Sequence, residues 1–361
     1  MKKLFVILSL LLPMLPSAFG QEFVTGADMG WLTEMESKGQ LLYNEKGEPR
    51  EGTLLMKEYG MQAVRLRVWV NPVKHGNWCS KEDVLNKALR AKALGMDVMI
   101  DFHYSDWWAD PGKQNIPAAW SGFTPEKAAK AVADHTREVL LFLQTYGVKP
   151  RWVQVGNETT HGFLWSVRSD PRTGWPLPDS LGNNVVIEDI ARAETHPEAY
   201  AKIFAAGYDA VKEVCPDAQV IVHLDDGFSK ELYTWNLDIL KKNGAKFDLV
   251  GMSLYPYWAL EGKKRDTADA AIDDCIENIK YVAKRYQCDV MIVETGMEAL
   301  QPEEGYRQLK RILYESRHNT EGHCRGVFYW EPQCRPSQYK LGAFSEDGRP
   351  TKIMKAFLEC Q

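Results

Sequence analysis

Residues 151–165 read RWVQVGNETTHGFLW, and the change of character within this stretch guides the interpretation of the whole chain. The run 152–155 has the aromatic and β-branched composition of a buried strand, yet a glycine, an amide and a carboxylic acid follow it directly. A packed apolar core has no use for Asn157 and Glu158. These two side chains therefore lie in solvent, or they carry out chemistry at the end of a strand.

The rest of the chain repeats this arrangement, with short apolar segments that alternate with longer amphipathic ones. No linker, low-complexity tract or sequence repeat interrupts the alternation, which is typical of parallel βα units. The predicted strands are 23–28, 63–69, 97–103, 151–157, 218–224, 247–254, 289–294 and 325–331. The predicted helices are 53–60, 80–95, 125–146, 197–214, 230–243, 267–286, 303–318 and 351–359.

Eight strands, each followed by a helix, predict a closed (β/α)8 TIM barrel, and we expect it to form one catalytic domain over residues 21–361. Counting alone leaves an open doubly wound sheet as the alternative. The position of the polar residues favours the barrel, because function in a barrel gathers at the carboxyl ends of its strands. The polar or aromatic residues at these predicted ends are Arg65, Arg67, Trp69, Asp101, His103, Asn157, Glu158, His223, Asp225, Asp226, Tyr255, Glu294, Trp330 and Glu331.

The first twenty residues are expected to lie outside this fold. Two lysines precede an apolar run over 4–15, and small residues at 18–20 suit a cleavage site. We interpret 1–20 as a secretory signal peptide that is cut before Gln21, which predicts export to the periplasm, the cell surface or the medium. Two prolines interrupt the apolar run well short of the roughly twenty residues of a membrane span, and no cysteine near the cut offers a lipid anchor.

Composition limits the possible partners. Lys and Arg number 44 against 49 Asp and Glu, and the formal net charge of −5 without a basic run argues against nucleic acid or an anionic membrane. The 12 Trp and 15 Tyr suit stacking on sugar rings, although a large core would use many of them too. Among the seven cysteines, Cys275 and Cys288 are too far apart along a helix to pair, as are Cys324 and Cys334 along a strand. We expect few disulfides or none, and a monomer.

Glu158 and Glu294 stand out because each ends an apolar strand. A single glutamate in such a place is more often a solvated loop residue or half of a buried ion pair. Two carboxylates that face each other across a cleft are suited to glycoside hydrolysis, since one protonates the leaving oxygen and the other attacks the anomeric carbon or activates water. Glu158 and Glu294 are therefore the predicted catalytic residues.

Further segments extend this pattern over almost the whole chain after residue 20. They are GADMGWLTEME (26–36), VRLRVWVNP (64–72), DFHYSDWWADPGKQNIPAAW (101–120), QVGNET (154–159), VHLDDGFS (222–229), SLYPYW (253–258), VETG (293–296) and FYWEP (328–332). In these segments the chain resembles glycoside hydrolase family 53, the endo-β-1,4-galactanases of clan A. The 101–120 segment is highly specific for the family, whereas QVGNET alone indicates only the clan.

The resemblance implies a retaining endo-galactanase that acts on β-1,4-galactan, the side chain of type I arabinogalactan and pectin. By motif, Glu158 is the acid/base and Glu294 the nucleophile. The acid must be protonated near neutral pH, so burial or the other carboxylate has to raise its pKa. The nucleophile has to stay ionised, which a nearby guanidinium would ensure; Arg65 and Arg67 are the candidates, and the clan pattern favours Arg65.

Other residues are expected to bind the substrate. Asn157 resembles the clan's asparagine that hydrogen-bonds the 2-hydroxyl group of the cleaved sugar. The N-glycosylation pattern at 157–159 is discounted, because a glycan there would block the site. Trp330 is expected to form the floor of the sugar pocket, and Trp108, rather than Trp107, to contact sugar. The remaining predicted substrate-binding residues are Asp28, Arg65, Arg67, His103, Asp106, His223, Asp225, Asp226 and Tyr255.

Several of these residues have a structural alternative. Tyr255, placed to hydrogen-bond the nucleophile, could be a core tyrosine, and His103 a core histidine. Arg67 could form a salt bridge at the rim of the barrel. Either Asp225 or Asp226 could cap the helix that follows Ser229.

No cofactor or metal is expected to be required. Some bacterial relatives carry a calcium site in long loops, whereas the 295–303 connection is short and lacks a cluster of Asp and Asn. Calcium stays an alternative at 342–350, where Ser345, Glu346 and Asp347 weakly resemble the oxygen ligands of such a site.

The sequence leaves two alternative functions. Another clan A retaining endo-glycanase, such as a mannanase or cellulase, is disfavoured by the segments WADP and HLDDG. A non-catalytic glycan-binding protein is disfavoured by the presence of both carboxylates.

Overall fold

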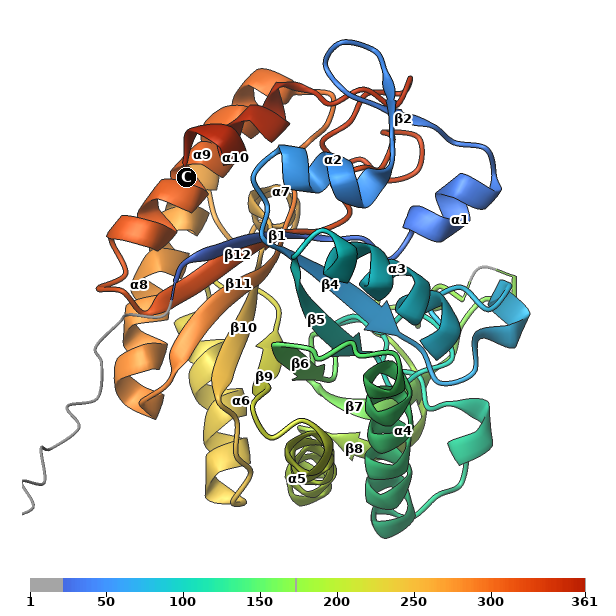
Figure 1. Ribbon diagram of the computed structural model, residues 1–361. Helices are drawn as coiled ribbons and strands as arrows, with labels where there is room; N and C mark the ends of the chain where they lie inside the picture. Colours follow the sequence, from blue (N-terminus) through green and yellow to red (C-terminus); the bar gives the residue numbers. More distant parts are fainter. Residues whose placement is uncertain (1–21, 173, 361) are drawn as a thin grey trace, which may run out of the picture.

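Eight parallel strands close into a barrel in this computed structural model, which describes residues 22–172 and 174–360 (Figure 1). Around the barrel the strand order is β1-β12-β11-β10-β9-β6-β5-β4, so strands that follow one another as barrel members are neighbours. The strands are β1 (Val24–Asp28), β4 (Ala63–Val68), β5 (Asp97–Phe102), β6 (Trp152–Val155), β9 (Gln219–Leu224), β10 (Leu249–Leu254), β11 (Asp289–Thr295) and β12 (Cys324–Tyr329). The predicted (β/α)8 barrel is confirmed, and the open doubly wound sheet is excluded.

Helices surround the barrel and return the chain from the carboxyl end of one strand to the start of the next (Figure 1). They are α2 (Gly52–Glu58), α3 (Lys81–Ala93), α4 (Pro125–Thr145), α5 (Pro197–Val214), α6 (Lys230–Lys242), α8 (Ala268–Tyr286), α9 (Pro302–His318) and, after a 3-10 turn over Lys352–Met354, α10 (Lys355–Glu359). Side-chain caps begin several of them: Ser80 accepts from the Asp83 amide, and Thr124 accepts from the Lys127 amide.

The structure adds short elements that the periodicity did not predict. They are α1 (Leu32–Ser37), β2 (Leu42–Tyr43), β3 (Pro49–Arg50), the 3-10 turns Pro72–His75 and Ala118–Trp120, β7 (Gly162–Val167), β8 (Val186–Arg192) and α7 (Pro256–Glu261). Of these, β7 and β8 form an antiparallel hairpin that follows β6. The predicted strand 151–157 is too long, because Gly156 leaves the strand with a φ of 94°.

An apolar cluster fills the inside of the barrel beneath the strand ends. Its members are Val24, Ala63, Met99, Trp152, Ile221, Leu249, Met291, Val293 and Phe328. Gly26 gives Phe328 its space, since a Cβ at that position would lie 2.3 Å from the phenylalanine ring. A second, larger apolar layer lies between the strands and the helices. Because the interior is packed, polar groups of the strands find room only near the mouth.

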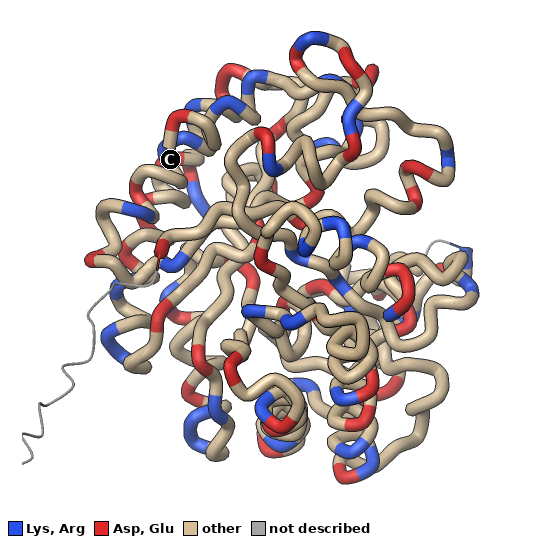
Figure 2. The backbone as a smooth tube through the Cα atoms, viewed as in Figure 1, with Lys and Arg blue, Asp and Glu red and all other residues tan. Residues whose placement is uncertain are grey.

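The charged side chains lie mainly outside this core. Lys and Arg alternate with Asp and Glu along the outer helices (Figure 2). No helix in the described ranges has both the length and the apolar character that crossing a bilayer requires. All seven cysteines fall within those ranges, and each is a free thiol. The predicted signal peptide, 1–20, lies outside the described residues.

Candidate active site

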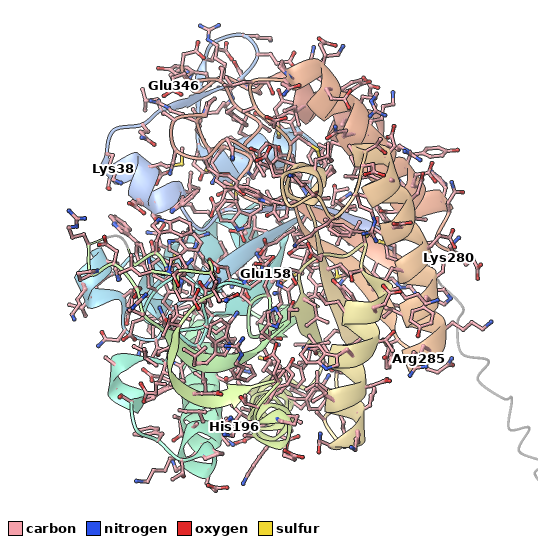
Figure 3. All side chains as sticks on the ribbon, turned by 180° about the vertical axis from the view of Figure 1, so that it is seen from behind. Lys38, Glu158, His196, Lys280, Arg285 and Glu346 are labelled. Atoms are coloured by element: carbon pink, nitrogen blue, oxygen red, sulfur yellow. The ribbon has the colours of Figure 1, made fainter. Side chains whose placement is uncertain are left out.

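A cavity of about 670 Å³ opens at the carboxyl ends of the strands and contains both predicted catalytic glutamates. Figure 3 labels Glu158 among these strand ends, near the centre of the molecule. Its aromatic lining residues are Trp31, Trp107, Trp108, Trp175, Tyr255, Trp258, Trp330 and Tyr339. Its polar lining residues are His103, Asp110, Lys113, Asn157, Glu158, Asp225, Asp226, Ser253, Lys264, Glu294 and Gln338.

A larger depression, of about 910 Å³, lies elsewhere, against α6 and α8. Side chains of both charges line it, and none of them is a predicted site residue. The active site is therefore assigned to the smaller cavity, which collects the predicted functional groups from six strand ends.

Glu294 lies in β11 and has two partners that stabilise its charged form. Arg65 Nη1 lies 2.9 Å from Glu294 Oε1, and the Tyr255 hydroxyl donates to Glu294 Oε2 at 2.9 Å. Arg65 is fixed in turn by Asp28 at 2.6 Å and Asp101 at 2.9 Å. Arg65, and not Arg67, is thus the guanidinium beside this carboxylate, and Tyr255 is more than a core tyrosine.

Glu158 follows β6 on a strained backbone, with a φ of 45° in the left-handed region. Its Oε1 accepts a hydrogen bond of 2.6 Å from the Ser253 hydroxyl. His223 supports this arrangement from behind, since its Nδ1 accepts from the Glu158 amide at 3.2 Å. The proton then belongs on Nε2, 2.9 Å from Ser253 Oγ, a tautomer assigned from the hydrogen bonds.

The pKa values of the two glutamates reflect these different surroundings. Burial raises the pKa of Glu158 well above its usual value, and the charges of Glu294 and Asp225 raise it further. Burial also raises the pKa of Glu294, to about 7, although Arg65 opposes the increase. Because the carboxyl groups titrate as a pair, the arrangement favours the proton on Glu158 and the negative charge on Glu294.

A buried ionic layer lies beneath the cavity and contains four of the residues predicted to bind substrate. Asp28 and His223 have no exposed surface, Arg65 and Arg67 have 1 %, and none of the four lines the cavity. Asp28 pairs with both Arg65 and Arg67, and Arg67 also pairs with Glu331. Charges taken into a barrel interior have to be paired there, so these residues position the site from below. The ion-pair alternative for Arg67 is confirmed, although the pair is buried and not at the rim.

Tryptophans form one wall of the cavity above this layer. The rings of Trp31, Trp108 and Trp330 contact one another, and the centroid of Trp31 lies 5.4 Å from that of Trp108 and 5.1 Å from that of Trp330. The Arg67 guanidinium packs over the Trp108 ring at 4.1 Å. Trp107 also lines the cavity, but His75 stacks on its ring at 3.4 Å. Each of the two tryptophans thus has one occupied ring face, and the preference for Trp108 as the sugar-contacting tryptophan stays a prediction.

Asp106 does not line the cavity, so its prediction as a sugar contact is not supported. Its carboxylate accepts from the amides of Asn71 at 3.0 Å and Ala118 at 2.9 Å, which joins two loops. His103 does line the cavity, and its ring is fixed by Asp101 at 3.1 Å and by the Ala109 amide at 3.0 Å. Burial lowers the pKa of His103, so the ring is neutral.

Asp225 and Asp226 line the cavity beyond Glu158. Asp225 accepts from the Thr160 hydroxyl, and Asp226 pairs with Lys264. Burial and the charge of Asp226 raise the pKa of Asp225 to about 6. The carboxylates thus contact residues across the cavity mouth and not the start of α6.

Asn157 is 4 % exposed and lines the cavity between the two glutamates and the ionic layer. Its Oδ1 accepts from Arg65 Nη2 at 2.7 Å, and its Nδ2 donates to the Ala109 carbonyl at 2.8 Å. This burial agrees with discounting the glycosylation pattern. Gln114 fixes the backbone here by donating to the carbonyl of Asn157 at 2.7 Å.

Several lining residues were not predicted. Ser253 precedes Tyr255 by two positions at the end of β10, and this same-face spacing was a signal for it. Trp258 belongs to the quoted segment SLYPYW. Those on loops without strand periodicity are Trp31, Asp110, Lys113, Trp175, Lys264, Gln338 and Tyr339.

In the segment 342–350, which was the alternative calcium site, the carboxylates contact protein groups. Glu346 accepts from the Ser337 amide at 3.1 Å, and Asp347 lies 3.2 Å from Arg349. Over residues 22–172 and 174–360, no group of three or more His, Cys, Asp or Glu side chains could hold a metal ion.

A closed parallel barrel whose mouth holds two buried, differently supported glutamates in an aromatic cleft defines a glycoside hydrolase of the barrel class. The sequence model of Glycosyl hydrolase family 53 matches residues 24–355, and the chain belongs to this family.

Curated relatives and a solved structure agree with this assignment. The arabinogalactan endo-β-1,4-galactanase of Cellvibrio japonicus (strain Ueda107) is 29 % identical over 367 residues, which cover 93 % of this chain and 90 % of the relative. The endo-β-1,4-galactanase of Bacillus subtilis (strain 168) is 28 % identical over 343 residues, 88 % of this chain and 71 % of the relative. The Ignisphaera aggregans GH53 catalytic domain superposes with a TM-score of 0.77 at 26 % identity, covering 96 % of this chain and 97 % of that one.

Proposed function

We propose that this family 53 hydrolase is a retaining endo-β-1,4-galactanase, with Glu158 as the acid/base and Glu294 as the nucleophile. The observation that carries the proposal is the asymmetry between the two carboxyl groups. Glu294 contacts a guanidinium and a phenol, both of which favour its ionised form. Glu158 is buried beside other carboxylates, which favours its protonated form. The relatives' activity on arabinogalactan supports galactan as the substrate.

In the first step, Glu294 Oε attacks the anomeric carbon of a β-galactosyl unit as the glycosidic bond breaks. The proton of Glu158 moves to the departing 4-oxygen of the next sugar, so a neutral hydroxyl leaves and a galactosyl ester forms on Glu294. Arg65 and Tyr255 hold the attacking carboxylate in place. Positive charge that develops on the sugar ring in the transition state is stabilised by the negative charge that the Glu294 carboxylate still carries.

In the second step, the ionised Glu158 takes a proton from water, and the resulting oxygen attacks the anomeric carbon. The ester bond breaks, Glu294 leaves as a carboxylate, and the product keeps the β configuration. Ser253 and His223 hold the Glu158 side chain and backbone through both proton transfers. Glu158 as acid and base, Glu294 as nucleophile and one water molecule are sufficient for both steps. We therefore propose that no cofactor is required.

The substrate-binding groups proposed on this basis are six residues of the cavity lining near the two glutamates. Trp108 and Trp330 offer aromatic faces to sugar rings, and Asn157, His103, Asp225 and Asp226 offer hydroxyl partners. We propose that galactan is preferred over cellulose because the axial 4-oxygen of each galactose bends the chain at every linkage, and a cleft that fits this bend does not fit the straighter chain of the epimer. We further propose a monomer that is exported by means of its first twenty residues.

A panel of polysaccharides tests the function. The purified protein is incubated with potato-type galactan, carboxymethyl-cellulose and galactomannan, and reducing sugar and the first product anomer are followed. We expect internal cleavage of galactan, a β product by NMR, and little release from the others. Comparable release from cellulose or galactomannan would favour another endo-glycanase, and no release from any of them would favour a glycan-binding protein.

A further inference from the structure

The loop between β7 and β8 brings an exposed tryptophan to the mouth of the active-site cavity. Trp175 is 65 % exposed, yet it lines the same cavity as Glu158 and Glu294. Burying the exposed surface of such a ring against a ligand is favourable, because this apolar surface is otherwise hydrated. Trp175 therefore presents ring surface to a ligand that already occupies the cavity and extends out of it.

The loop is held against the segment that follows β5. Lys113 Nζ lies 4.5 Å from the centroid of the Trp175 ring, and the lysine is itself ion-paired with Asp110. Asn184 donates to the Gly112 carbonyl at 2.8 Å. The Lys113 side chain is only 5 % exposed, so it is a fixed support and not a mobile surface cation. These contacts fix the position of the Trp175 indole at the edge of the cavity.

Both parts of sugar recognition are present in the cavity that Trp175 lines. The indole offers an apolar surface, and Asp110, Lys113, Asp226 and Lys264 line the same cavity with charged partners for hydroxyl groups. A sugar ring has an apolar face and a polar edge, so it suits this combination.

Other exposed apolar residues lie near the same loop but do not line the cavity. Leu181 is 83 % exposed and Ile187 is 66 % exposed. These side chains would suit a protein partner as well as solvent. Their separation from the cavity makes them controls for the role of the tryptophan.

We propose that Trp175 forms an additional sugar-binding subsite at the mouth of the cleft, where it stacks on a galactose unit of a longer galactan chain. The inference rests on the proposed function and adds to it a dependence on chain length. Contacts made far from the cleaved bond are used to bind and orient the polymer. A short substrate that occupies only the positions beside the two glutamates gains nothing from this subsite.

The test compares Trp175→Ala with Trp175→Phe and Leu181→Ala in the full-length protein. Each variant is assayed on galactan and on 4-nitrophenyl β-1,4-galactobioside. Trp175→Ala is expected to lower kcat/KM on galactan about tenfold, mainly through KM, and to change the value on the aryl galactobioside less than about twofold. Trp175→Phe should keep most of the wild-type value, and Leu181→Ala should match wild type on both substrates.

Two outcomes would overturn the subsite. An unchanged kcat/KM of Trp175→Ala on galactan would exclude the subsite. Equal losses on both substrates would also exclude it, because they would indicate that the substitution disturbs Glu158. A dimer in sedimentation that Trp175→Ala and Leu181→Ala both dissociate, with galactan kinetics intact, would assign the loop to self-association instead. If wild type does not cleave galactan at all, the proposed function has failed, which differs from each of these results.

Discussion

Arg65 Nη1 lies 2.9 Å from Glu294 Oε1, in a layer of the barrel where the arginine has almost no contact with solvent. The same guanidinium pairs with Asp28 and Asp101, so it cannot turn away from the glutamate without leaving other charges unpaired. Among residues 22–172 and 174–360, Glu158 has no cationic partner of this kind, and it accepts a hydrogen bond from the Ser253 hydroxyl instead. The two glutamates therefore have different chemistry although both are buried at strand ends.

Replacing Glu158 by Ala should slow cleavage of galactan by about a thousandfold, the range of a general acid. The loss should be far smaller on an aryl galactoside with a good leaving group, because that group departs without a proton. Added azide should restore turnover and give a β-galactosyl azide. Equal losses on both substrates without rescue would assign the acid to another residue.

Replacing Glu294 by Ala should abolish turnover but leave binding of galacto-oligosaccharides nearly unchanged, since the residue acts by attack and not by ground-state affinity. Calorimetry with a galactotetraose and kinetics on galactan measure the two properties. Glu294→Gln is the matched variant of similar size. More than a few per cent of the wild-type rate without added nucleophile would contradict the role.

The pH profile of kcat/KM should be bell-shaped, with an acidic limb from protonation of the pair at Glu294 and a basic limb from loss of the Glu158 proton. Tyr255 donates to Glu294 and lowers its pKa, so Tyr255→Phe should move the acidic limb to higher pH, by about one unit.

Ser253→Ala is the matched change on the other glutamate. Ser253 donates to Glu158 and lowers its pKa, so its loss should move the basic limb to higher pH. An acidic limb that moves in Ser253→Ala, or a basic limb that moves in Tyr255→Phe, would contradict the assignment of the two pKa values.

The buried ion pairs of Arg67 should contribute to stability. Arg67→Met leaves Glu331 buried without its cation and Asp28 paired with Arg65 alone, and we expect a loss of about 3 kcal/mol in the free energy of unfolding. Urea denaturation measures it. Lys130→Met, which removes an exposed pair with Asp134, should cost less than about 1 kcal/mol. Similar effects of the two substitutions would show that burial of the Arg67 pairs adds no stability.

The alternation of apolar strands and amphipathic helices was enough to predict the barrel, because each strand period and each helix cap is a local property. The same pattern placed Glu158, Glu294, Asn157 and Tyr255 at strand ends, and the structure brings all four to one cavity. Strand position, however, tells which way a side chain points and not how deep it lies. Asp28, Arg67 and His223 were for this reason predicted to touch substrate.

Hydrophobic periodicity could not predict where the loop residues lie in the structure. Trp175 and Lys113 lie on different loops, and their contact depends on how the hairpin packs against the segment after β5. Asp106 lies in a family-like segment, but one of the two amides that it accepts from, that of Asn71, belongs to the loop after β4. Long-range contacts of this kind leave no signature in the local sequence.

The most direct test of the mechanism is trapping of the galactosyl ester with an activated 2-deoxy-2-fluoro-galactobioside. The fluorine slows both steps, whereas the good leaving group keeps formation of the ester faster than its hydrolysis, so a covalent adduct accumulates. Mass spectrometry of the intact protein and of its peptic peptides locates the label. We predict one added 2-deoxy-2-fluoro-galactobiosyl group, attached to Glu294, and none in Glu294→Gln. A label on another residue, or full inactivity toward the reagent in a protein that cleaves galactan, would contradict Glu294 as the nucleophile.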